Sequence, residues 1–171
     1  IPEVVGCRLT GARRPGITST DIVLAVVQAL RRKGVIGKLV EFFGPGAAAL
    51  SLPDRATLSN MAPEYGATMG FFPVDQVTLH YLRMTGRAEA DIALAEAYAK
   101  AQGMWGDPAR QALYNDTIEI DLGAIAAAMA GPRRPQDRHL LAEVPKSFRA
   151  AFPAAAKADP AQRSPARPQQ H

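Results

Sequence analysis

The chain has 171 residues, 47% of them hydrophobic, which is enough for one ordinary domain with a buried core. Its formal net charge of +4 is weakly basic, but the cations are scattered, which favours a solvated surface over a dedicated anionic partner. The single cysteine, Cys7, excludes an internal disulfide and a cysteine cage for a metal. No apolar run approaches the roughly 20 residues of a membrane span, and no signal peptide is visible, so the sequence predicts a cytoplasmic protein.

The first part of the chain predicts a strand followed by a helix. Residues 4–9 form an apolar run typical of a buried strand, in which Cys7 is a small core residue. Residues 18–33 predict a helix, because Thr18 and Asp21 have the spacing of a capping box and apolar side chains recur at i, i+3, i+4 and i+7. Cations crowd the last turn of this helix, where they suit the helix dipole.

The next stretch holds the polar residues of greatest interest. Residues 38–43 predict a second strand, and a short helix follows and runs through Asn60. Pro63 lacks an N–H, so we expect that helix to break or re-form there. Asn60 and Glu64 are four residues apart and share a face if the helical path survives Pro63. They also lie where a helix gives way to a loop, a common position for site residues.

The alternation of strands and helices continues after this stretch. Residues 68–72 predict a short strand, and Asp75 caps a further helix. His80 on that helix has no second histidine at ligand spacing and reads as a surface or core-edge residue. Residues 88–102 predict an alanine-rich helix that packs against the sheet, and residues 117–122 alternate like a strand with one less buried face. This order predicts an α/β fold with three layers, α/β/α, around a small, mostly parallel sheet.

Composition changes towards the end of the chain. The glycine- and proline-rich residues 131–135 read as a boundary, and residues 148–152 are the last apolar trace. From residue 153 the sequence has no large apolar side chain and no periodicity, which predicts disorder. We therefore divide the chain into a domain of residues 1–152 and a proline- and alanine-rich tail of residues 153–171. The start at Ile1 suggests an internal piece of a longer protein, and the tail suggests a break in the coding sequence.

Several blocks of sequence resemble one enzyme family, the aconitases. The central block is NMAPEYGATMGFFPVD, and seven others accompany it in the family order: VVGCRLTG, ITSTDIVLAVVQALRRKGVIGKLVEFFGPG, LSLPDRAT, VTLHYLRMTGR, AEAYAKAQGMW, IEIDL and AGPRRPQDR. The resemblance covers residues 1–152. FFPVD and AGPRRPQDR favour the bacterial aconitase and iron-regulatory-protein branch. Isopropylmalate isomerases share only the looser core NM..E.GA, whereas 2-methylisocitrate dehydratases are closer.

The resemblance implies a fragment of an iron–sulfur hydro-lyase that interconverts citrate and isocitrate through cis-aconitate. In the whole enzyme a [4Fe–4S] cluster is held by three cysteines, and a serine acts as the base. Both lie in motifs absent from this chain, and Cys7 matches none of them. Asn60 and Glu64 match the family's site asparagine, near the cluster, and its site glutamate, which faces the substrate hydroxyl or the iron-bound water. No catalytic residue or metal ligand is assigned here.

The resemblance also implies partners. The missing aconitase domains, in cis or as a companion chain, would complete the site for a tricarboxylic acid, and the chain alone would be inactive. Arg133 and Arg134 match a family domain boundary and read as structural. Three alternatives stay open: a fragment of a 2-methylisocitrate dehydratase, an RNA-binding iron-regulatory relative, and a non-functional remnant. RNA binding is the least supported of the three, because no stripe of aromatic side chains accompanies the basic residues.

Overall fold

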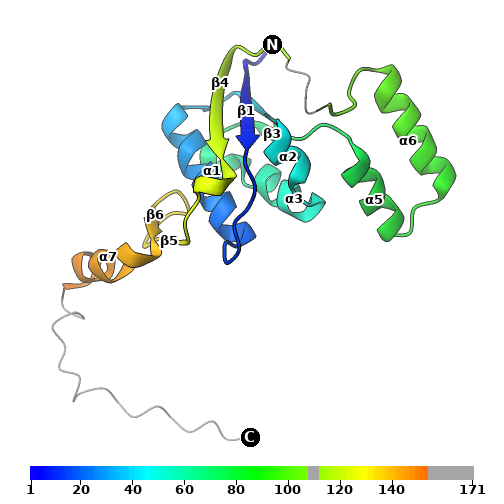
Figure 1. Cartoon of the computed structure of the whole chain (residues 1–171). Helices are drawn as coiled ribbons and strands as arrows, with labels where there is room; N and C mark the ends of the chain where they lie inside the picture. The colour runs from blue at the N-terminus through cyan, green and yellow to red at the C-terminus, as the bar shows by residue number, and fades with distance from the viewer. Residues whose placement is uncertain (108–111, 154–171) are drawn as a thin grey trace, which may run out of the picture.

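A four-stranded parallel sheet forms the centre of the computed structural model, which describes residues 1–107 and 112–153 (Figure 1). The strand order is β3-β2-β1-β4. The strands are β1 (Val4–Thr10), β2 (Leu39–Phe43), β3 (Met69–Phe71) and β4 (Asp116–Asp121). The predicted α/β class and small parallel sheet are confirmed. The predicted tail lies almost wholly outside the described residues, so the division after residue 152 remains a prediction.

Helix α1 (Ser19–Lys33) forms as its capping sequence predicts. The Thr18 hydroxyl accepts a hydrogen bond from the Asp21 N–H, and the Asp21 carboxylate accepts one from the Thr18 N–H, which closes the capping box. At the other end Gly34 adopts the left-handed conformation (φ 79°) that terminates the helix. Local sequence chemistry therefore determines both ends of α1.

One face of the sheet packs against helices and forms the main hydrophobic core. Helix α1 lies there together with α3 (Leu52–Asn60) and α4 (Ala62–Tyr65). Cys7 is fully buried on β1, as predicted. The strand and helix side chains of this core include Val5, Cys7, Val40, Phe42, Val26, Val27, Leu30, Leu58 and Tyr65.

A short helix follows β2 directly, at the Gly44-Pro45-Gly46 sequence. Helix α2 (Pro45–Ala49) begins directly at the proline, which suits a first helical turn. A Cβ atom on Gly46 would lie 2.8 Å from the carbonyl carbon of Leu9, so glycine allows α2 to approach β1 closely. This approach depends on tertiary packing, which the local sequence pattern did not reveal.

The second helical layer of the predicted three-layer arrangement is displaced to the edge of the sheet. Helices α5 (Gln76–Met84) and α6 (Glu89–Ala101) form a hairpin beyond β3 (Figure 1). The prediction that residues 88–102 pack on the sheet is wrong: α6 packs against α5, because the short connection between the two helices folds α6 back on its neighbour. On the sheet face opposite the core, the Tyr114 ring packs against Gly6 and Phe43.

The C-terminal part of the described chain contains a hairpin that the sequence analysis treated as a boundary. The hairpin is formed by the antiparallel strands β5 (Ala128–Ala130) and β6 (Arg138–Leu140). The short helix η1 (Leu122–Ala124) precedes it, and η2 (Leu141–Glu143) and α7 (Val144–Ala151) follow it. The Asp21 carboxylate accepts a hydrogen bond of 2.7 Å from the Ala128 N–H, and the Arg14 guanidinium donates one of 2.8 Å to the Ile125 carbonyl. The hairpin is therefore anchored to the main body.

A membrane span requires a long apolar helix, and none of the helices in the described parts of the chain meets that requirement.

Replacing Asp21 should destabilise the fold. Its side chain is 5% exposed and bonds both to the start of α1 and to β5. Asp21→Ala removes a helix cap and leaves the Ala128 N–H without its partner, so we expect a loss of about 2–4 kcal/mol in the free energy of unfolding. Urea titration would measure it. The control is Asp91→Ala, at an exposed position in the first turn of α6, which should change stability by under about 0.5 kcal/mol. Equal losses of stability in the two variants would contradict the structural role of Asp21.

The same carboxylate should make stability depend on pH. Burial alone would raise the pKa of Asp21, but hydrogen bonds from Thr18 and Ala128 and the charge of Arg138 outweigh it and lower the pKa. Because the folded-state pKa is lowered, the stabilisation is present above the unfolded carboxyl pKa of about 3.9 and is lost as the pH falls through the folded value. Below about pH 4 the parent should lose stability more steeply than Asp21→Asn. Parallel curves in urea unfolding at pH 3 to 7 would contradict this.

Candidate functional site

The two predicted site residues lie at the junction of α3 and α4. Asn60 is the last residue of α3, Met61 interrupts the helix (φ −87°, ψ 18°), and α4 begins again with Pro63 in its first turn. The helix thus breaks and re-forms, as predicted. The Met61 N–H still bonds to the Thr57 carbonyl, and the Tyr65 N–H bonds to the Met61 carbonyl. These hydrogen bonds continue the helical turn across Met61, so Asn60 and Glu64 lie on successive turns.

This junction lies at the amino-terminal edge of the sheet. Gly66, two residues after Glu64, accepts a hydrogen bond of 3.2 Å from the Gly37 N–H, and Thr68 donates one of 2.8 Å to the Lys38 carbonyl. Gly37 and Lys38 come directly before β2. Ligands of open α/β sheets usually bind at the opposite, carboxyl edge. Fold class alone would therefore direct attention away from Glu64.

The environment of the Glu64 carboxylate is unusual. Its Oε2 atom is buried and has no hydrogen-bond partner among the described residues, whereas Asn60 is exposed. Buried polar atoms in native proteins are nearly always hydrogen-bonded, and leaving one unpaired costs about 1–3 kcal/mol. An unpaired buried carboxylate oxygen is therefore the feature expected of a group whose partner is a ligand or another part of a larger protein.

The neighbouring residue Tyr65 helps to hold Glu64 in place. Tyr65 is fully buried, and its hydroxyl donates a hydrogen bond of 3.1 Å to the Leu58 carbonyl. Burial, helped by the nearby Glu64 carboxylate, raises the pKa of Tyr65, so the phenol stays protonated and keeps donating. Gly70 on β3 leaves the space that the tyrosine hydroxyl occupies. The backbone of α4 is thus tied to both α3 and the sheet.

The residues of this chain do not fit the ligands of an iron–sulfur cluster. Such clusters are held mainly by cysteine thiolates, and the sequence has one cysteine. Cys7 faces the core, and burial raises the pKa of its thiol, which disfavours the thiolate that binds metals. Across residues 1–107 and 112–153, no group of three or more His, Cys, Asp or Glu side chains is placed to hold a metal ion. His80 is exposed on α5, in agreement with the surface position predicted for it.

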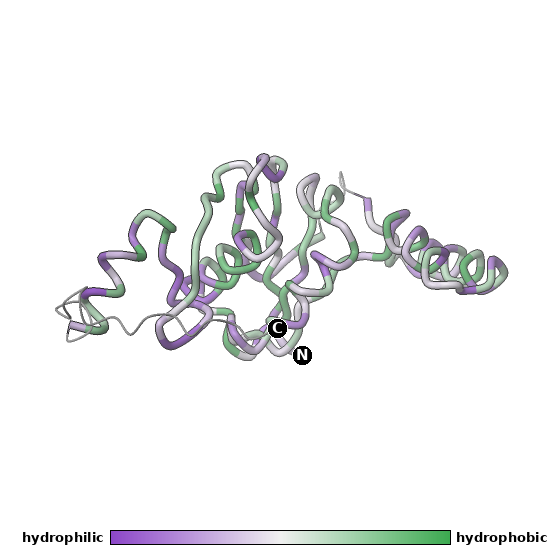
Figure 2. Tube along the Cα trace, turned by 90° about the horizontal axis from the view of Figure 1, so that it is seen from below, coloured by the Kyte–Doolittle hydropathy of each residue, from purple (hydrophilic) through white to green (hydrophobic). Residues whose placement is uncertain are grey.

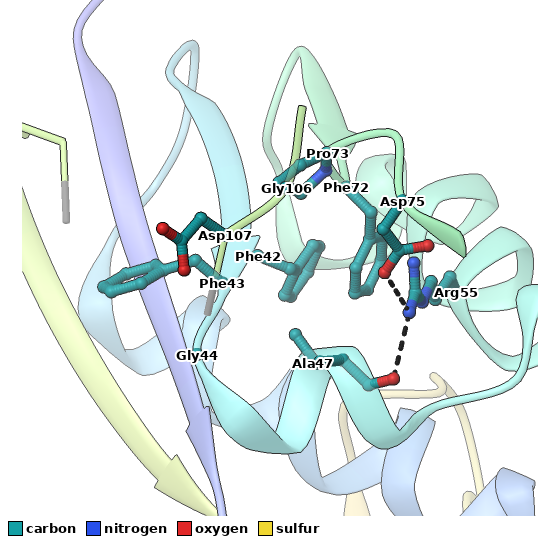
Figure 3. Close-up of a pocket in the computed structure, with 11 residues that line it drawn as sticks. Phe42, Phe43, Gly44, Ala47, Arg55, Phe72, Pro73, Asp75, Gly106 and Asp107 are labelled. Carbon is teal, nitrogen blue, oxygen red and sulfur yellow. Dashed lines mark hydrogen bonds and ion pairs between the residues drawn. The ribbon is translucent and has the colours of Figure 1, made fainter. Parts of the chain in front are cut away.

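A second polar feature, which the sequence analysis missed, lies at the carboxyl edge of β2 and β3. Figure 3 shows Arg55 between Asp75 and the ring of Phe72. The Arg55 guanidinium is 2.8 Å from the Asp75 carboxylate, donates to the carbonyls of Ala48 and Leu50, and lies 5.7 Å from the Phe72 centroid. The signal for this pairing is a tertiary contact between residues 20 positions apart, which no local pattern encodes.

The Arg55 cluster is better explained as a structural connection than as a ligand site. The adjoining cavity holds about 30 Å³, which is room for about one water molecule. Arg55 is 3% exposed and its charge is already paired with Asp75, whose other oxygen caps α5. Arg133 and Arg134 are exposed in the turn between β5 and β6, nearly 70 positions after Glu64 in the chain. Of the polar groups at these positions, Glu64 is the one with a buried atom that lacks a partner among the described residues.

Comparison with known proteins gives a consistent result. The model of the aconitase family (aconitate hydratase) matches residues 1–170, a range that includes most of the segment set apart above as a tail. Aconitate hydratase A of Escherichia coli K12 is 57% identical over 150 residues, covering 88% of this chain and 17% of the relative. The Pseudomonas aeruginosa and Thermus thermophilus enzymes of that name are each 57% identical, over 86% of the chain and 16% of their own lengths. The chain thus spans about a sixth of these curated relatives.

Removing the unpaired carboxylate should stabilise the isolated chain. Glu64→Met replaces a buried oxygen without a partner by an apolar group of similar length, so we expect the free energy of unfolding to rise by about 1 kcal/mol. Glu89→Met is the matched control: it removes an exposed glutamate paired with Arg83 and should change stability by under about 0.5 kcal/mol. Urea unfolding at pH 7 measures both. A clear loss of stability in Glu64→Met would show that this carboxylate already has a partner.

Proposed function

The chain belongs to the aconitase family, and from this premise we propose that it forms an internal domain of an aconitate hydratase, the hydro-lyase that interconverts citrate and isocitrate through cis-aconitate. Because the chain spans 17% of its relatives, the activity belongs to the complete enzyme. The family's [4Fe–4S] cluster supplies a Lewis-acidic iron, and its cysteine ligands and the serine base come from other parts of the protein. A cytoplasmic location is part of this proposal.

The unpaired buried oxygen of Glu64 is the observation that supports this function best. A carboxylate accepts hydrogen bonds from a substrate hydroxyl or a bound water, and nothing in the described chain donates to this oxygen. The exposed Asn60 amide, one turn earlier, can donate a hydrogen bond without adding charge. We assign both residues to the part of the tricarboxylic acid site that this domain contributes. Tyr65 and the α3–α4 break then serve to position the carboxylate.

The alternatives fit less well. The relatives compared above are aconitate hydratases, which favours that activity over 2-methylisocitrate dehydration. RNA binding is less well supported, because no stripe of aromatic side chains accompanies the basic residues. Three of the surface cations, Arg8, Lys33 and Lys38, are moreover paired with Glu119, Asp116 and Glu3. A gel shift at low salt tests RNA binding directly. A non-functional remnant and a working domain differ in one respect, namely whether the chain completes an enzyme when the missing parts are supplied.

The isolated chain should have no aconitase activity and should bind no [4Fe–4S] cluster. A cubane cluster is normally fixed by three or four thiolates, and the chain offers only the buried Cys7. The measurement is citrate-to-isocitrate turnover, iron content and visible absorption after anaerobic reconstitution with iron and sulfide. A stoichiometric brown cluster on the chain alone, with turnover that Glu64→Gln abolishes, would overturn this prediction.

Addition of the missing parts tests the proposed function itself. We expect the 171-residue chain to restore turnover to an Escherichia coli aconitate hydratase A polypeptide that lacks the matching segment. Glu64→Gln should lower the restored kcat by about 10²-fold or more, as expected for loss of a group that contacts the reacting atoms. Glu89→Gln, on the exposed surface of α6, is the control and should leave kcat unchanged. Restoration that is indifferent to Glu64→Gln would refute the assigned role.

A further inference from the structure

Large apolar side chains are exposed together at the C-terminal end of the described chain. We call this group the α7 patch. Its members, with their exposed fractions, are Met129 (50%), Phe148 (50%) and Phe152 (48%), which line one shallow pocket. Contiguous exposed apolar groups of this kind mark interaction surfaces in native proteins. The patch lies at the opposite end of the molecule from the α5–α6 hairpin (Figures 1 and 2).

Helix α7 itself is poorly supported by its own chain. It has eight residues, none of them buried, and it contacts chiefly β6 and η2. Helices this short are marginal in water unless an apolar face is packed. The rings of Phe148 and Phe152 lie 5.3 Å apart between centroids and still leave about half of each side chain exposed. The apolar face of α7 is therefore formed but not covered.

A groove beside the patch adds a charge preference. It encloses about 1,100 Å³, and Arg133, Arg138 and Lys146 are among its lining residues. The acidic residues of the lining are used locally: Asp137 accepts from the Arg134 N–H and Glu143 from the Leu140 N–H. The Nε atom of Arg138 is buried and has no hydrogen-bond partner among the described residues. Because that atom is buried and another nitrogen of the same guanidinium donates to the Ala126 carbonyl, Arg133 and Lys146 are the cations that the groove presents next to the apolar surface. Their charges suit an acidic side chain.

The end of the chain does not supply the complementary group. Residues 154–171 contain no large apolar side chain, and Lys157, Arg163 and Arg167 outnumber Asp159. This composition matches neither the apolar patch nor the basic groove. The occupant must therefore combine apolar residues with an acidic one, and the relatives' sequences outside the 17% matched here provide ample length for such a segment.

We propose that the α7 patch and its groove form a docking surface for a segment of the remaining aconitase, one that places apolar side chains on Phe148 and Phe152 and an acidic side chain against Arg133 and Lys146. This inference rests on the proposed function. It adds a named interface, distinct from the Asn60–Glu64 site, through which the domain joins the rest of the enzyme.

The test uses the whole 171-residue chain and the Escherichia coli polypeptide that lacks the matching segment, with affinity measured by calorimetry. The double variant Phe148→Ser/Phe152→Ser and the single variant Lys146→Glu should each weaken binding at least tenfold. Leu94→Ser and Lys100→Glu make matched changes on α6, where Leu94 is 68% exposed, and should leave the affinity unchanged. Circular dichroism checks that each variant is folded. If the double variant is unfolded, the single variant Phe148→Ala takes its place.

The possible outcomes separate this inference from the proposed function. Equal binding by the parent and by the Phe148 variants overturns the inference while leaving the proposed function intact. No binding by the parent overturns both. If light scattering shows that the parent chain self-associates and the phenylalanine variants do not, the patch binds a second copy of the chain. That result also overturns the inference. A rise in apolar dye binding when residues 154–171 are removed would show that the end of the chain covers the patch, with the same consequence.

Discussion

The Asp21 carboxylate is the interaction on which the arrangement of the chain most depends. One of its oxygens closes the capping box of α1, and the other accepts the Ala128 N–H from the distant hairpin. A buried carboxylate is stable only when its oxygens are satisfied, so the start of α1 and the hairpin must lie together. That constraint places β5 and β6 against α1 of the main body, although more than 100 residues separate Ala128 from Asp21.

Arg55 and Glu64 show how hydrogen-bond satisfaction separates a structural group from a functional one. Arg55 has a carboxylate, two carbonyls and an aromatic ring around it, and its role is to join the α2–α3 connection to the start of α5. Glu64 is held by a rigid backbone, yet one of its oxygens has no partner in the described chain. Evolution usually keeps an unsatisfied buried polar atom only where something outside the fold completes it.

The fold has the character of a part of a larger protein. Its sheet has one well-packed face, its α5–α6 hairpin projects beyond β3, and α7 carries exposed phenylalanines (Figure 1). Parallel sheets are normally covered on both faces. Here Tyr114 covers part of the second face in place of a helix. The incomplete layer, the incomplete Glu64 site and the exposed patch all agree with a chain that spans 17% of its relatives.

The sequence by itself determined the features that depend on local chemistry: the ends of α1, the break at Pro63, the alternation of strands and helices, and the family with its candidates Asn60 and Glu64. The structural features follow from caps, proline geometry and hydrophobic periodicity, which act within a few residues. The family and its two candidates follow from the resemblance of several sequence blocks to the aconitases. Only the tertiary structure decided that α6 packs on α5, that Asp21 anchors the β5–β6 hairpin, that Arg55 is satisfied and that Glu64 is not. Each of these is a contact between distant residues, and the burial that sets its energy exists only once the chain has folded.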